Sequence, residues 1–153
     1  MEHLVDVQEA AWPLVVVRIP PVLDVRAIES MYQGFDRMVT RRTKFTALVD
    51  TSALRTFPQA VERKLIAEGR ASRVMTEAAF NLGNAVFLTS AAARLVLRLI
   101  EWVRPPVVPQ YLVPTFAEGV EWCCGRLARA HIPLTPEIEA LRRDAQLAEG
   151  RAP

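Results

Sequence analysis

A short polar turn follows the most strand-like segment in the middle of the chain. Phe45 to Val49 is an apolar run, and Asp50, Thr51 and Ser52 come directly after it. An open α/β sheet places its functional groups just beyond the carboxyl ends of its central strands, so these residues form a candidate reactive loop. Two other interpretations stay open. Asp50 and Ser52 can hydrogen-bond the loop backbone in an Asx or Ser/Thr turn, and a hydroxyl here could accept a phosphoryl group.

The other residues with nucleophilic, acid–base or metal-binding chemistry form no catalytic set. His3 and His131 are separated by most of the sequence, and no G-x-S-x-G motif accompanies them. The glycines stand singly, so no phosphate-binding fingerprint exists. Cys123 and Cys124 are adjacent and would point about 100° apart on a helix, so they are expected to be small core residues. The sequence therefore predicts a non-enzyme with no catalytic residues, no cofactor and no metal site.

A second candidate region is the predicted helix from Ala91 to Val103. Projected at about 100° per residue, its charged residues share a narrow arc, while apolar side chains fill more than half of the circumference. A helix that lies on one sheet does not need so wide an apolar face, so the excess could bind a partner, a second copy or a lipid chain. Alternatively, the terminal helices cover it. The candidate surface comprises Leu99, Trp102, Val103, Pro105, Pro106 and Val107.

The elements that would position these residues alternate between strands and helices. Two β-branched runs near the N-terminus predict an antiparallel pair, and a helical stripe from Asp24 to Arg42 separates them from the strand at Phe45. This order is typical of a parallel crossover unit, so the fold class is α/β. A capping box at Thr56 and Gln59 predicts the next helix start. Further elements are a turn at 81–84, a strand at 85–89 after it, the helix at 91–103 capped by Ser90, an edge strand at 111–113, a helix capped by Thr115 and a last helix opened by Thr135.

Length and composition limit the remaining possibilities. The chain has 153 residues, 51% of them hydrophobic, which suits one domain with a substantial core. Its 19 basic and 17 acidic residues are scattered, so no basic stripe predicts nucleic-acid binding. The N-terminal segment has no positive leader, and no apolar window approaches the roughly 20 residues of a transmembrane helix. We therefore expect a soluble, cytoplasmic protein with no transmembrane segment.

The order of these features resembles the STAS-like, or SpoIIAA-like, family over roughly residues 3–130. The resemblance rests on the LVD-x-S end of the strand at Phe45, the NAVFLTS strand and the AAARLVLRLIEWV helix. It implies a mixed, mostly parallel sheet of about five strands with helices packed mainly on one side. The STAS-like domain would span residues 1–132, and residues 133–153 would form a C-terminal helical extension with a frayed tail.

Family members known as anti-anti-sigma factors are binding modules that are switched by phosphorylation of a serine. The corresponding region here, Arg55 to Ala60, lacks that serine, so only Asp50 and Ser52 carry over by position. The Trp102 to Pro106 segment is similar to a branch associated with lipid carriers. The resemblance and the surfaces therefore predict a non-enzymatic regulatory protein-interaction module. It would bind a partner or itself through the loops after the strands at Phe45 and Ala85 and through the apolar Ala91 to Val108 surface, with a carrier or sensor of a lipid-like ligand as the alternative. An enzyme that uses the Asp50/Ser52 loop is a second alternative.

Overall fold

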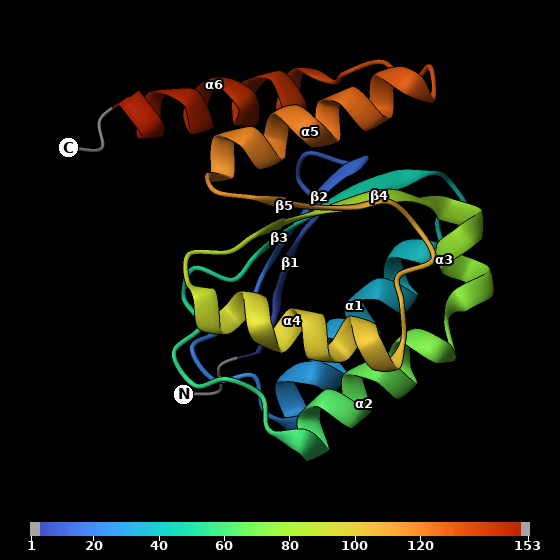
Figure 1. Cartoon of the computed structure of the whole chain (residues 1–153). Coiled ribbons are helices and arrows are strands. Elements are labelled where there is room, and N and C mark those ends of the chain that lie inside the picture. The colour runs from blue at the N-terminus through green and yellow to red at the C-terminus, as the bar shows by residue number, and fades with distance from the viewer. Residues whose placement is uncertain (1–3, 151–153) are drawn as a thin grey trace.

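The chain folds around one mixed sheet (Figure 1). The computed structural model describes residues 4–150, without the side chains of residues 102 and 103. Within that part of the chain, five strands lie in the order β1-β2-β3-β4-β5, with β1 antiparallel to β2 and the other neighbours parallel. The predicted α/β class, the N-terminal strand pair and the mostly parallel sheet are confirmed. The strands are β1 (Asp6–Gln8), β2 (Leu14–Arg18), β3 (Phe45–Asp50), β4 (Asn81–Phe87) and β5 (Gln110–Val113).

Helices cover both faces of this sheet. Strands β2, β3, β4 and β5 are neighbours in chain order, so the chain always moves in the same direction across the sheet. Because connections between parallel strands are right-handed, the helices of these connections lie on the same face. Accordingly α1, α2 and α4 share one face, while α5 and α6 cover the opposite one (Figure 1). The helices are α1 (Val25–Val39), α2 (Ala60–Ala71), α3 (Val74–Phe80), α4 (Ala91–Val103), α5 (Phe116–Arg129) and α6 (Pro136–Gly150).

Strand alternation divides the buried residues into two cores. In β3, Phe45 and Val49 face α1 and α2, whereas Leu48 faces α5, because successive strand side chains point to opposite faces. Cys123 and Cys124 are buried on the α5 side, which confirms that they are core residues. Helix α6 contributes the fully buried Ile138 to the same core. The sheet therefore separates one core beneath α5 and α6 from another beneath α1, α2 and α4.

Most of the predicted helix starts are confirmed by side-chain caps. Asp24, Ser90 and Thr115 each accept a hydrogen bond from the backbone N–H three residues later, at 2.9, 3.1 and 3.1 Å. The predicted capping box at Thr56 and Gln59 is wrong. Gln59 occupies the N-cap of α2 without a side-chain cap bond, and the backbone of Thr56 pairs with Val22 in an isolated bridge instead.

The predicted turn at 81–84 is also wrong, because β4 already begins at Asn81. Asn81 Oδ1 accepts a hydrogen bond from the Gly83 N–H at 2.9 Å, and Gly83 has a φ of 148°. A glycine tolerates this backbone conformation, so the turn-like sequence forms an irregularity inside the strand. The register with β3 shifts there, between Phe45 and Ala47.

The terminal helices do not cover α4. Helix α4 packs beside α2, whereas α5 contacts β3, β4, β5 and α6 on the other face of the sheet (Figure 1). The sequence interpretation in which α5 or α6 buries the excess apolar surface of α4 is therefore wrong. The reason is topological, since the chain changes faces after β5.

Candidate functional site: a cavity between the sheet and its helices

The strand-end loop is held by structural hydrogen bonds. The buried Asp50 carboxylate accepts from Arg18 Nη1 at 2.5 Å and from the Ser52 N–H at 2.9 Å. The Thr51 hydroxyl donates to the Phe87 carbonyl at 2.7 Å, which ties this loop to β4. These contacts confirm the Asx-turn interpretation of the loop. His131 lies at the C-terminal end of α5, and His3 lies outside the described residues.

A cavity of about 220 Å³ lies between the sheet and the layer formed by α1, α2 and α4. Strand residues Val17, Phe45, Ala47 and Val86 line one side of it. Most of the wall is apolar, because this is the face where the strands direct Val, Ile, Leu and Phe toward the helices. The helices supply Met31, Phe35, Met38, Ile66, Ala93, Val96, Leu97 and Ile100 to the opposite wall.

The two ends of the cavity differ in polarity. Near the carboxyl ends of the strands the wall is formed by Leu54, Pro58, Leu88 and Leu97. Polar side chains from separate elements converge near the amino ends of β4 and β5. An elongated ligand would therefore contact one apolar end and one polar end of the cavity. The polar end is formed by Arg70 of α2, Glu77 of α3, Asn81 and Asn84 of β4 and Gln110 of β5.

Strand pairing brings the amides of this polar end together. Asn84 and Gln110 are register partners on β4 and β5, so their side chains project from the same face of the sheet. Asn81 Nδ2 donates to Asn84 Oδ1 at 2.9 Å, and Gln110 Nε2 donates to the carboxylate of Glu101 in α4. Arg70 Nη1 donates to the Arg104 carbonyl at 3.1 Å, just after α4 ends. Helices α2 and α4 are thus joined above the polar end.

Glu77 is the buried acid of this cluster, with a relative exposure of 8%. Burial disfavours the charged carboxylate and raises the pKa of Glu77 above its ordinary value. The positive charge of Arg70 and a hydrogen bond with the Asn84 side chain oppose this effect without cancelling it. Glu77 therefore takes up a proton more readily than an exposed glutamate does.

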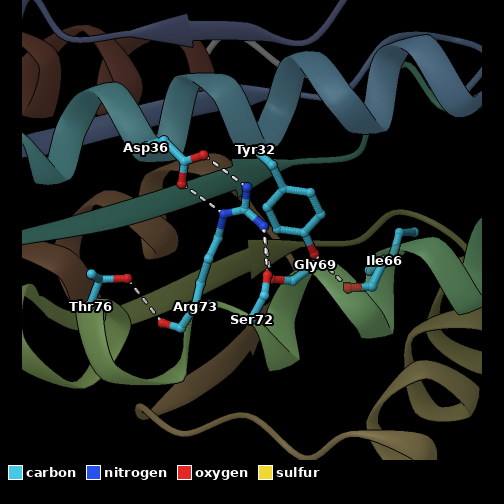
Figure 2. A network of polar contacts seen from close by, with 7 residues as sticks. All are labelled: Tyr32, Asp36, Ile66, Gly69, Ser72, Arg73 and Thr76. Atoms are coloured by element: carbon cyan, nitrogen blue, oxygen red, sulfur yellow. Dashed lines mark hydrogen bonds and ion pairs between the residues drawn. The ribbon is translucent and has the colours of Figure 1, made fainter.

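Arg73 closes the adjoining part of the wall by clamping α1 to the junction of α2 and α3 (Figure 2). Its guanidinium donates to both carboxylate oxygens of Asp36, at 2.7 and 2.8 Å, and stacks 4.3 Å from the centre of the Tyr32 ring. The Tyr32 hydroxyl donates to the Ile66 carbonyl at 2.6 Å, and burial raises the pKa of Tyr32 to about 12. Tyr32 is therefore a neutral structural side chain at physiological pH.

The predicted partner surface is only partly exposed. Leu99 and Val107 are exposed, as is Pro105, whereas Pro106 is half-buried. The opposite side of α4 is directed into the cavity through the residues named above, so one helix carries an inward and an outward apolar face. The side chains of Trp102 and Val103, also predicted for this surface, lie outside the described part of the structure.

Sequence reasoning missed the polar end of the cavity. Asn84 and Gln110 occupy strand positions on the face where Val86 and Leu112 point toward the helices. A polar residue at an inward position of an apolar strand is the signal that could have identified them. Arg70 and Glu77 carry no comparable signal, because charged residues are ordinary on the surfaces of helices.

Comparison with protein-family models, with curated proteins and with solved structures finds no match to this chain. The resemblance to the STAS-like family therefore stays a prediction. Among residues 4–150, no helix is long and apolar enough to cross a membrane. That same part of the chain contains no group of three or more His, Cys, Asp or Glu side chains placed to hold a metal ion.

Proposed function

We propose that this chain is a non-enzymatic carrier or sensor that binds a lipid-like ligand in the cavity between its sheet and helices α1, α2 and α4. The observation that supports this function is the apolar cavity of about 220 Å³. Well-packed interiors contain few voids larger than a water molecule, so an unfilled apolar space of this size is a candidate ligand site. Helix α4, which leads into the Trp102 to Pro106 segment that the resemblance associates with lipid carriers, supplies part of its wall.

The size of the cavity favours a slender ligand. It exceeds the roughly 150 Å³ of an apolar cavity that admits benzene, and it is below the roughly 300 Å³ at which pockets for drug-sized molecules begin. Each methylene transferred from water to such a site contributes about 0.8 kcal/mol. A medium-length acyl chain would therefore gain several kcal/mol from burial alone.

Native mass spectrometry of protein purified from its own host tests this function. We expect a non-covalent adduct of lipid-like mass that is lost when the protein is denatured. Ala47→Leu enlarges a buried side chain that lines the cavity from β3, so it should reduce the adduct. Ala92→Leu adds the same atoms at an exposed position of α4 and should leave the adduct unchanged. A wild-type protein without an adduct, and without binding of added decanol, would contradict the proposal.

The outward face of α4 favours a second candidate function, association with a protein partner or a second copy of the chain. Leu95 is 59% exposed, Leu99 38% and Val107 41%, and they form a regulatory interaction surface in this interpretation. Replacing both leucines with serine should abolish self-association in light scattering or partner capture in pull-down. Unchanged results in both measurements would exclude this use of the surface.

A further inference from the structure

The charged lining of the cavity has an excess of positive groups. Among the described residues, the charged side chains that line it are Arg70, Arg73 and Glu77. Arg73 is neutralised by its two hydrogen bonds to Asp36. Burial raises the pKa of Glu77, and the positive charge of Arg70 acts in the opposite direction. Arg70 interacts electrostatically with Glu77, but within the described residues it forms no ion pair of the kind that Arg73 forms with Asp36.

Arg70 also has hydrogen-bonding capacity that its contacts within residues 4–150 do not use. A guanidinium carries five N–H donors in a planar fork, and the Arg104 carbonyl accepts from one of them. No ion pair within 4.0 Å joins Arg70 to an acidic side chain in the described part of the chain, Glu77 included. A planar carboxylate is the group that matches this fork with two parallel hydrogen bonds.

The two acidic side chains near Arg70 each have an amide side chain as hydrogen-bond partner. The Glu101 carboxylate accepts from Gln110 Nε2, and Glu77 is hydrogen-bonded by Asn84. The strand amides can complete the shell around the head group, because they lie beside each other at the same end.

We propose that the ligand of this cavity is a medium-chain fatty acid whose carboxylate pairs with Arg70 and whose chain extends beneath α4 toward Leu88 and Leu97. This inference rests on the proposed carrier function and specifies the class of its ligand. The apolar end accommodates the methyl end of the chain, and the polar end orients the molecule. A neutral alcohol of the same length would keep the burial of the chain and lose the pairing of charges.

Calorimetric titration with decanoate, decanol and decylamine tests the head-group assignment. In the wild-type protein decanoate should bind more tightly than decanol, and decylamine should bind weakest. Arg70→Gln removes a charge-assisted pair and should weaken decanoate binding about 10- to 100-fold, while changing decanol binding less than about threefold. Retained decanol binding also shows that the variant is folded. Lys64→Gln on the exposed side of α2 changes the net charge equally and should leave all three affinities unchanged.

The outcomes separate this inference from the function on which it rests. If neither decanoate nor decanol binds to the wild-type protein, the carrier function itself is wrong. If decanol or decylamine binds at least as tightly as decanoate, the cavity is a ligand site and the carboxylate assignment is wrong. Equal decanoate affinity in wild type and Arg70→Gln would also overturn the assignment, because the pairing would contribute nothing.

Discussion

Glu77 shows how a single buried acid links the cavity to the stability of the fold. Its side chain is desolvated between α3 and β4, and the raised pKa means that the folded chain holds the proton more tightly than the unfolded chain. Arg70 from α2 and Asn84 from β4 are the groups that favour the charged form. The contribution of Glu77 to stability is therefore complete below the pKa of the unfolded state, and it declines as pH rises through the folded-state pKa.

Glu77→Gln should remove this pH dependence. The amide keeps the shape and the ability to accept from Asn84 without a charge to desolvate, so the variant should exceed wild type in unfolding free energy at neutral pH. The difference is about 1.4 kcal/mol for each unit by which the folded-state pKa exceeds the unfolded-state pKa. Urea unfolding from about pH 4 to about pH 8 measures it. A variant whose stability falls with pH as steeply as that of wild type would show that Glu77 is not the titrating group.

The sequence predicted the features that depend on hydrogen bonds between neighbouring residues. The caps at Asp24, Ser90 and Thr115 and the turn at Asp50 depend on hydrogen bonds to backbone groups within a few residues, so sequence spacing is sufficient to predict them. The polar end of the cavity could not be predicted in this way. Arg70 and Gln110 are brought together only by the packing of α2 and α4 over the sheet.

At the scale of elements, the contact between α1 and α2 depends on one glycine. A Cβ on Gly69 would lie 2.2 Å from Cε2 of Tyr32, whose ring is held by the Ile66 carbonyl and by Arg73 (Figure 2). The absent side chain allows the ring to lie against α2, close to the cavity wall. Gly69 therefore serves helix packing within α2.

Gly69→Ala should destabilise the protein despite the higher helix propensity of alanine. The clash with a fixed ring should cost up to about 3 kcal/mol, which outweighs the roughly 1 kcal/mol that alanine gains in a helix. Gly125→Ala in α5 is the matched control, because no neighbouring atom of the described residues lies within 4 Å of a Cβ added there, and it should stabilise the fold. Thermal and urea unfolding of both variants measure the difference. Equal stabilisation by the two substitutions would disprove the packing role of Gly69.

At the scale of the whole molecule, sequence order predicted the sheet better than the helix layers. The alternation of strand and helix patterns determines a parallel sheet and, through right-handed crossovers, the common face of α1, α2 and α4. Sequence order does not determine the face that a helix after the last strand will cover. The placement of α5 and α6 on the second face leaves Leu95 and Leu99 exposed and gives each face its own core.

These separate cores make the central claim directly measurable. Amide NMR spectra recorded while decanoate is added should show shifts concentrated at cavity-lining residues of β3, β4 and α4, such as Val49, Val86 and Leu97. The amide resonances of α6, around Ile138 on the other face of the sheet, should not shift. That pattern is the predicted result. Saturating decanoate that shifts no amide, or shifts only those of α5 and α6, would contradict a ligand site between the sheet and helices α1, α2 and α4.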